Sequence, residues 1–370
     1  MVPVDGGPAD GALGLLSAVG DAFAGRRLGF GRRRAAIAAA FARHRGAWVD
    51  QIAANWIAGA LAELGLVRLT VGSDISEHAR ELLLADAPLY GAHLLTEIGL
   101  PAAAADIVRW HCEHFDGTGT PDRLRWDGIP ADAAALGIVH AFTQALENPE
   151  EPRHVAEALF ALVAENGRRF SVELVRAFRE FVLLRPQEIE DAGDLPLPAL
   201  DDDAILVRLA GWIDARDDRT RGRSERLAAI AAPLAARIGL DGSRAARLMR
   251  LHALGRAAQA VEFDAYDPLS RFAHDRRLAE ARRAAALAAT AARYAIDAEL
   301  VAASAVWYEE GAVDRYSGVL ALALAVDLLD PLEQPRRVAA AAGSQFDPEL
   351  ARAYLDALAQ GQDDGKVRSS

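Results

Sequence analysis

Two histidines, a cysteine and two carboxylates lie close together in one segment of the first half of the chain, HCEHFDGTGTP. Imidazole, thiolate and carboxylate groups bind metal ions and transfer protons, so this segment is the strongest candidate for chemistry. The glycines permit the positive φ angles of a tight turn, and the sequence DGIP follows shortly afterwards. The residues of interest are His111, Cys112 and Glu113, followed by the signature loop Asp116, Gly117, Gly119 and Pro121.

This segment resembles the HHE…DGxGYP…IP motif of HD-GYP proteins, a family of the HD superfamily. The resemblance implies an all-helical domain that holds two or three metal ions and hydrolyses the bacterial second messenger cyclic di-GMP. His111 and Cys112 stand at the two adjacent histidine positions of the motif, and Thr120 replaces its tyrosine. The resemblance therefore predicts a bacterial protein of cyclic di-GMP signalling.

Most of the metal ligands that the resemblance implies are absent from the first half. No histidine lies between Arg27 and Ala42, and LAELGL stands where the family has LHDIGK. Ala87 replaces the histidine of the family's HPxxG motif. The residues that remain form a vestigial site: Glu63, His111, Cys112, Glu113 and His140.

A single zinc or iron ion is one interpretation of this set. One carboxylate, two imidazoles and one thiolate suit a tetrahedral zinc site made of Glu63, His111, Cys112 and His140. Adjacent residues of a helix point about 100° apart, however, which opposes convergence of His111 and Cys112 on one ion. We therefore expect no metal or other cofactor, and keep the mononuclear site as the alternative.

The second half resembles the same family with fewer ligands. The segment TRGRS is similar to the family's TxGHS, with Arg223 in place of a ligand histidine, and LHALGR keeps His252 but has Ala253 for the bridging aspartate. We place residues 306–309 at the HHE motif and Asp327 at the later aspartate position. His252 and Asp327 alone would not hold a pair of divalent cations, so this half should be free of metal.

The elements that must position these residues are helices. Alanine, leucine and arginine dominate, apolar residues recur at helical spacing in 34–42 and 226–238, and strand-like alternation is almost absent. The segment GRRFSVELVRAF at 167–178 matches GSQFDPELARAY at 343–354, which indicates an internal duplication. The sequence thus predicts an all-α fold of two tandem HD-domain-like helical bundles.

Proline residues and an acidic run divide the chain near its middle. The predicted organisation is an N-terminal segment 1–22, a first domain 23–184, a linker 185–203, a second domain 204–360 and a disordered tail 361–370.

Composition excludes several classes of protein. The formal charge of −12 over 370 residues argues against binding to nucleic acid, whose backbone is itself negative. The single cysteine excludes an intrachain disulfide and fits a reducing cytoplasm. No apolar run has the length of a membrane span, so no membrane insertion is expected.

The resemblance and the lost ligands together predict a catalytically inactive HD-GYP-like signalling or scaffold protein. It would act by binding a signalling protein, with a cyclic dinucleotide as a possible second ligand and a homodimer as a possible assembly. The alternative is a metal-dependent phosphodiesterase with an altered mononuclear site in the first half. A weaker resemblance is to HDOD domains, regulatory scaffolds that also lack the metal ligands.

Overall fold

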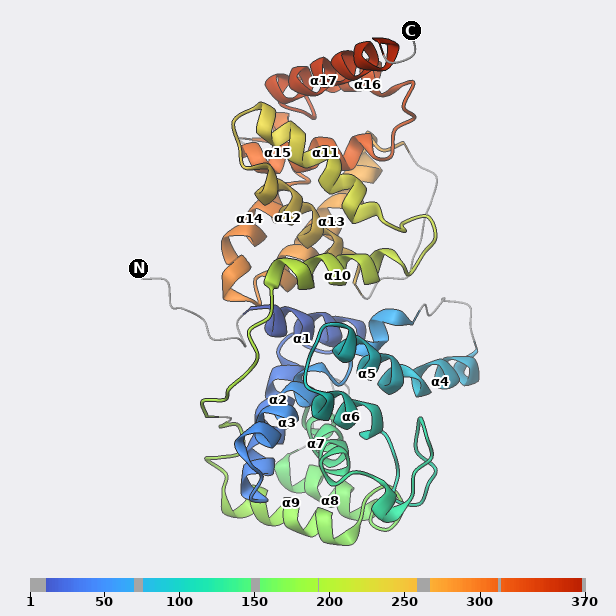
Figure 1. Ribbon diagram of the computed structural model, residues 1–370, viewed down its shortest axis with the longest axis vertical. Coiled ribbons are helices and arrows are strands. Elements are labelled where there is room, and N and C mark those ends of the chain that lie inside the picture. Colours follow the sequence, from blue (N-terminus) through green and yellow to red (C-terminus); the bar gives the residue numbers. More distant parts are fainter. Residues whose placement is uncertain are drawn as a thin grey trace. The chain divides into compact units, whose positions relative to one another are not determined.

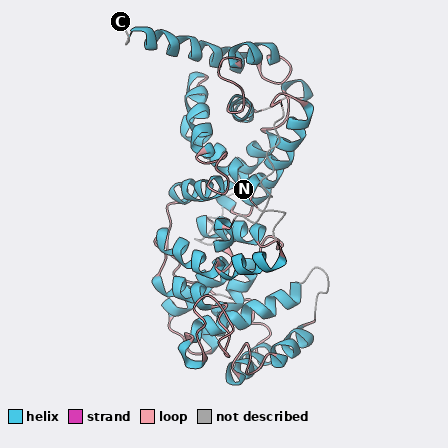
Figure 2. Ribbon diagram, turned by 90° about the vertical axis from the view of Figure 1, so that its right-hand side faces the viewer, coloured by secondary structure: helices cyan, strands magenta, loops and turns pink. Residues whose placement is uncertain are grey.

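The computed structural model describes residues 11–69, 76–147, 154–191, 193–257, 267–311 and 314–367. These residues form helices joined by loops and include no strand (Figures 1 and 2), so the predicted all-α class is confirmed. The chain divides into two compact units, unit 1 at Met1–Asp201 and unit 2 at Asp202–Ser370. Among the helices of the described ranges, none is long and apolar enough to cross a membrane.

Unit 1 consists of nine α-helices and two short 3-10 helices among its described residues. In chain order these are α1 (Ala12–Phe23), α2 (Phe30–His44), α3 (Val49–Leu61), η2 (Leu64–Arg68), α4 (Glu77–Ala85), α5 (Ala87–Glu97), α6 (Ala102–Trp110), η3 (Trp126–Gly128), α7 (Ala131–Glu147), α8 (Val155–Ala164) and α9 (Val172–Leu184).

The first helix, α1, belongs to the core of unit 1 although it lies within the segment 1–22 that we expect to precede the domain. Most of its side chains are buried. Near its end, the carboxylate of Asp21 accepts the amide N–H groups of Gly29 and Gly31, both at 2.8 Å. Gly29, at φ 96°, caps α2. Asp21 therefore fixes the position where α2 begins.

Small residues and aromatic rings build the core around α2. A Cβ added to Gly59 of α3 would lie 2.7 Å from the Cα of Ala35 on α2, so the two helix backbones pack closely. At the other end of α2, the rings of Phe41 and Phe178 meet edge to face with their centroids 5.0 Å apart. The ring of Phe142 on α7 packs against Phe178 at 5.2 Å. This packing orients α2 and α7, the helices that carry the candidate site.

The beginning of the segment that we expect to be a linker lies against unit 1. The guanidinium Nε of Arg33 on α2 donates to Oε1 of Glu190 at 2.7 Å, and Nη1 of Arg43 donates to the carbonyl oxygen of Asp191 at 3.0 Å. Contacts with α2 thus hold part of this segment in place.

Unit 2 has eight α-helices and three 3-10 helices among its described residues. They are α10 (Asp202–Asp214), α11 (Arg223–Arg237), α12 (Gly242–Ala253), η4 (Leu254–Arg256), α13 (Arg271–Ala288), η5 (Ala292–Tyr294), α14 (Ala295–Ala303), η6 (Tyr308–Glu310), α15 (Arg315–Val326), α16 (Gln334–Ala341) and α17 (Pro348–Val367). Helix α17 continues to Val367, into the segment 361–370 where we expect a disordered tail, and residues 368–370 lie outside the described residues.

The two units begin with the same local structure. In unit 2 the carboxylate of Asp214 accepts the amide and the hydroxyl of Ser224, as the carboxylate of Asp21 accepts two amides in unit 1. Gly222 caps α11 with φ 68°, in the place that Gly29 takes before α2. This correspondence sets Arg223 opposite Phe30, the first residue of α2.

Candidate functional site

A buried arginine lies among the predicted ligands of unit 1. Arg34 on α2 is 0% exposed, and its Nε donates to the carbonyl oxygen of Gly59 at 2.6 Å. Its Nη1 is 3.0 Å from Oε2 of Glu63 and 3.0 Å from Nδ1 of His140. Arg26 approaches the other oxygen of Glu63 at 3.6 Å. Since an arginine keeps its charge at any relevant pH, a fixed cation connects two of the four predicted ligands.

The other two predicted ligands lie where α6 ends. His111 is the C-cap residue of α6, and its Nδ1 is 2.7 Å from the carbonyl oxygen of Val108, an acceptor, so Nδ1 carries the proton. The free Nε2 is 3.4 Å from Sγ of Cys112. The centroids of the His111 and His140 rings are 5.4 Å apart. The structure thus brings two buried histidines and a half-buried cysteine into one group.

Burial keeps this group uncharged. It lowers the pKa of His111 to about 4 and that of His140 well below its ordinary value. It also raises the pKa of the Cys112 thiol to about 11. At neutral pH the cysteine is therefore a thiol, whereas a zinc ligand is a thiolate.

Glu113 supports the signature loop. Its buried carboxylate accepts the amide N–H groups of Asp122 at 2.6 Å and Leu124 at 2.9 Å. Burial raises the pKa of Glu113, and these amides act in the opposite direction. Glu113 thus ties residues 122–124 to the end of α6.

The signature loop itself is a turn built by short polar contacts and glycines. The carboxylate of Asp116 accepts the amide and the hydroxyl of Thr118 at 2.9 and 2.7 Å. Gly117 has φ 82°, and a Cβ there would meet the side chain of Arg125. A Cβ on Gly119 would lie 2.1 Å from the amide nitrogen of His114. Both glycines are needed for this backbone, which ends at Pro121.

In unit 2 the predicted ligand Asp327 is paired with arginines. The Nε of Arg223 lies 3.0 Å from Oδ2 of Asp327, and that of Arg226 lies 3.4 Å from Oδ1. Arg223 and Asp327 are both nearly fully buried. Burial acts to lower the pKa of Arg223, but the carboxylates of Glu280 and Asp327 outweigh it and raise this pKa. Arg223, which replaces a ligand histidine, thus forms an ion pair with Asp327, the aspartate that would bind a metal ion according to the resemblance.

The other remaining ligand of unit 2, His252, faces a carboxylate that the sequence did not reveal. Nδ1 of His252 is 3.7 Å from Oε1 of Glu280 on α13, and Arg256 lies 3.5 Å from the same oxygen. Arg256 also pairs with Asp214. Burial lowers the pKa of His252 to about 4. Burial acts to raise the pKa of Glu280, but His252, Arg223 and Arg256 outweigh it and lower this pKa.

Packing explains why Glu280 lies there. A Cβ on Gly255 would be 2.1 Å from the carbonyl oxygen of Glu280, and a Cβ on Gly65 would be 1.9 Å from that of Ala87. Glu280 therefore corresponds to Ala87, the position of the HPxxG histidine in the resemblance. No HPxxG-like sequence surrounds Glu280, so only the close approach to the glycine identifies it.

The predicted placement of residues 306–309 at the HHE motif was wrong. The hydroxyl of Ser304 donates to the carbonyl oxygen of Val301 at 2.6 Å, as Nδ1 of His111 does to Val108. The amide of Tyr308 donates to the carbonyl oxygen of Gln345, as that of Phe115 does to Arg169. Ser304 is thus the counterpart of His111. Neither Ser304 nor its neighbours resemble the HHE motif, so the sequence alone does not identify this position.

Within the ranges that the structure describes, no three His, Cys, Asp or Glu side chains are arranged to hold a metal ion. In each unit a buried guanidinium contacts the acid or imidazole groups that remain, Arg34 in unit 1 and Arg223 in unit 2.

Comparisons with known proteins bear on the family and the fold of the chain. Residues 26–174 match the HD domain family. Among solved structures, the chain is similar to a cyclic GMP-AMP specific phosphodiesterase of V. cholerae, V-cGAP3, with a TM-score of 0.67 and 16% identity. The match covers 94% of this chain and 96% of that chain, and at this identity it shows a shared fold. The curated proteins searched contain no match. The predicted relation to HD-domain proteins is confirmed by the match of residues 26–174, and the tandem arrangement of two such domains stays a prediction.

Proposed function

We propose that this chain is a catalytically inactive relative of the HD-domain cyclic dinucleotide phosphodiesterases and acts by binding a signalling protein. The observation that carries the proposal is the contact of the buried Arg34 guanidinium with both Glu63 and His140, each at 3.0 Å. A cation built into the fold stands beside the groups that would otherwise bind a metal ion.

The residues present do not fit the metal pair that the resemblance implies. Metal-assisted hydrolysis of a phosphodiester needs divalent cations to generate a hydroxide nucleophile and to neutralise the charge of the phosphate. In unit 1 the carboxylate at the bridging position, Glu63, is bound by Arg34, and in unit 2 that position is Ala253. A guanidinium at hydrogen-bond distance repels a divalent cation strongly in a buried site. We therefore derive no reaction step through metal ions.

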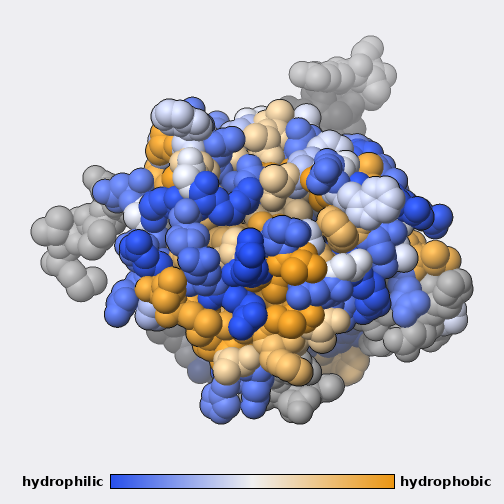
Figure 3. All heavy atoms as spheres, turned by 90° about the horizontal axis from the view of Figure 1, so that it is seen from below, coloured by the Kyte–Doolittle hydropathy of each residue, from blue (hydrophilic) through white to orange (hydrophobic). Residues whose placement is uncertain are grey.

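An exposed apolar surface on α8 and α9 supports the binding of a protein partner. Figure 3 shows the face of unit 1 that carries these helices, where apolar side chains lie between hydrophilic ones. Phe160 is 76% exposed and Leu184 is 67% exposed, which is unusual for side chains of this size. The large exposed apolar side chains on the two helices are Val155, Phe160, Val172, Leu183 and Leu184.

A cyclic dinucleotide is the second ligand within this proposal, on the ground that the similar V. cholerae protein acts on one. Arg109, Arg123 and Arg125 flank the signature loop and could contact phosphates. The guanidinium of Arg109, however, already binds the carboxylate of Asp122 at 2.8 and 3.0 Å. Phosphate contacts would thus come from Arg123 and Arg125, which are exposed.

Hydrolysis assays test the proposed lack of catalysis. The full chain is incubated with cyclic di-GMP or cyclic GMP-AMP and with manganese or ferrous ions, and the V. cholerae phosphodiesterase serves as the positive control. We expect no linear product from the chain. Product formation that disappears in the His111→Ala or His252→Ala variant would refute the proposal. Calorimetry of the same mixtures without added metal measures nucleotide binding separately.

A further inference from the structure

A cavity of about 330 Å³ lies in unit 1 between the segment that follows the signature loop and the start of α9. Its walls are mainly apolar and include Phe115, Trp126, Phe170 and Leu174. A cavity of about 150 Å³ is enough to bind benzene, and pockets for small ligands begin at about 300 Å³. The cavity therefore has room for a molecule with one or two rings.

Backbone hydrogen bonds hold the walls in place. The amide of Phe115 donates to the carbonyl oxygen of Arg169 at 3.1 Å, and that of Asp116 donates to Arg168 at 2.9 Å. The amide of Trp126 donates to the carbonyl oxygen of Phe115 at 3.1 Å. The Trp126 side chain is 61% exposed, which places it at the mouth of the cavity. The cavity thus exists without a rearrangement of these segments.

One wall carries a cation with no acidic partner. The guanidinium carbon of Arg169 is 5.2 Å from the centroid of the Phe170 ring, and Arg169 forms no ion pair with any residue that the structure describes. Its neighbour Arg168 is paired with Glu165. Helix α9 begins directly afterwards, with Ser171 as its N-cap, so its positive end lies at the same wall.

The acidic residues of the lining do not cancel this cation. The carboxylate of Glu113 is bound by the backbone amides of Asp122 and Leu124. Asp127 and Glu173 are exposed, where water and salt screen their charge. Arg169 is therefore the cation of the lining that an anion inside the cavity would contact.

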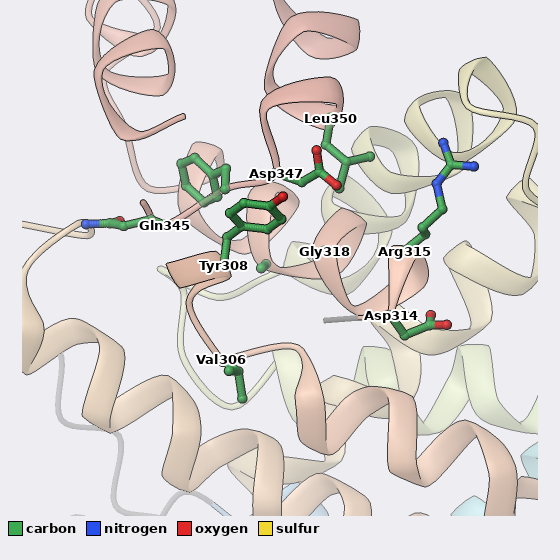
Figure 4. Close-up of a pocket in the computed structure, with 10 residues that line it drawn as sticks. Val306, Tyr308, Asp314, Arg315, Gly318, Gln345, Asp347 and Leu350 are labelled. Atoms are coloured by element: carbon green, nitrogen blue, oxygen red, sulfur yellow. The ribbon is translucent and has the colours of Figure 1, made fainter. Parts of the chain in front are cut away.

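The corresponding place in unit 2 shows that the fold does not require this cavity. There the space is only about 10 Å³, enough for a single water molecule. Figure 4 shows Tyr308, Gly318, Gln345 and Leu350 around it. A Cβ on Gly318 would be 2.7 Å from Cδ1 of Leu350, so this side chain fills the space.

The residue types differ between the two places in the way that binding would require. The backbone hydrogen bonds of Tyr308 and Phe115 match, which sets Gln345 opposite Arg169 and Val306 opposite Glu113. Unit 2 therefore has a much smaller equivalent with an uncharged glutamine at the position of Arg169, and the cation of its lining, Arg315, is paired with Glu349. The cavity of unit 1 is open, with the cation Arg169 in its wall and Trp126 at its mouth.

The geometry points to a second ligand site: the cavity of unit 1 binds a small molecule with one or two aromatic rings and a single anionic group, and Arg169 contacts the anion. The aromatic walls would pack against the rings. Arg169 also acts electrostatically on His111 and Cys112 of the neighbouring Arg34 cluster, but the inference does not depend on the proposed loss of catalysis.

Calorimetric titration of the full chain with 2-naphthoate tests the inference. We expect saturable binding of one molecule per chain, weakened about tenfold or more by Arg169→Gln, which introduces the residue found in unit 2. The matched control is Arg168→Gln, which removes a neighbouring positive charge outside the cavity and should leave the affinity unchanged. Ala134→Leu should fill the cavity and abolish binding, with circular dichroism confirming that the variant folds.

A probe of opposite charge completes the test. 2-Naphthylmethylamine has the same rings with a cation in place of the carboxylate, and it should bind more weakly than naphthoate. The inference is wrong if naphthoate shows no saturable binding up to millimolar concentration. It is equally wrong if the amine binds more tightly, or if Arg168→Gln weakens binding as much as Arg169→Gln.

Discussion

At the scale of single residues, Arg34 is expected to contribute strongly to the stability of unit 1. Its guanidinium neutralises Glu63 and donates to His140 and Gly59, and its side chain is 1% exposed. Arg34→Met would leave Glu63 with only the longer contact to Arg26. We expect the free energy of unfolding to fall by about 3–5 kcal/mol, because one partner of a buried pair is removed.

The neighbouring Arg33 provides the control. Its side chain is 37% exposed and pairs with Glu147 and Glu190, so solvent screens these contacts. Arg33→Met should lower the free energy of unfolding by about 1 kcal/mol or less. Urea denaturation measures both variants, and equal losses would contradict the role assigned to Arg34.

The buried His111 makes stability depend on pH. Burial lowers its pKa from 6.5 to about 4, so between these values the unfolded chain binds a proton that the folded chain does not. His111 thus stabilises the fold fully above pH 6.5, and this contribution is lost as the pH falls to about 4. Asp21 acts in the opposite sense, because burial raises its pKa from 3.8 to about 6.

A variant isolates the histidine from the aspartate. His111→Gln removes the titrating group and leaves Asp21 unchanged. Between about pH 7 and about pH 5 the variant should lose about 2 kcal/mol less stability than the natural chain, at about 1.4 kcal/mol per pH unit. Urea denaturation at the two pH values gives the difference, and parallel losses in both proteins would refute the assignment.

At the scale of elements, the close approach of η4 and α13 depends on Gly255. A Cβ at Gly255 would lie 2.1 Å from the carbonyl oxygen of Glu280, so the backbones would have to separate. We expect Gly255→Ala to destabilise unit 2 by about 1–3 kcal/mol or more. Thermal denaturation followed by circular dichroism measures the change.

Gly211 in α10 is the matched control in the same unit. No atom lies within 4 Å of a Cβ added there, and the residue is exposed within a helix. Gly211→Ala should therefore stabilise by about 0.5–1 kcal/mol. The opposite signs distinguish backbone contact from a general effect of alanine, and destabilisation by both would contradict this account.

The sequence predicted the helices better than the contacts between them. Helical spacing of apolar residues indicated the all-α class, and the repeated GxxF segments indicated that the two halves end alike. In the structure the amide of Gly167 donates to the carbonyl oxygen of Phe170 and that of Gly343 to Phe346, both at 2.8 Å. The role of Arg34 was not predicted, because the sequence does not distinguish a buried arginine in a helix from an exposed one. Glu280 escaped because its partner His252 lies far from it in the sequence.

At the scale of the whole molecule, the two units contain separate cores. Each of the segments Met1–Asp201 and Asp202–Ser370 is compact by itself. We expect the two segments, expressed separately, to unfold cooperatively, and their summed helical circular dichroism to match that of the intact chain. Absence of a cooperative transition in either segment would show that its core is incomplete alone.

The metal content of the purified full chain tests the central claim most directly. Elemental analysis after incubation with zinc, iron and manganese salts and removal of excess ions should give far less than one metal ion per chain. That result is expected because Arg34 and Arg223 already contact the remaining acids. A stoichiometric ion that is lost in the His111→Ala variant would contradict the account.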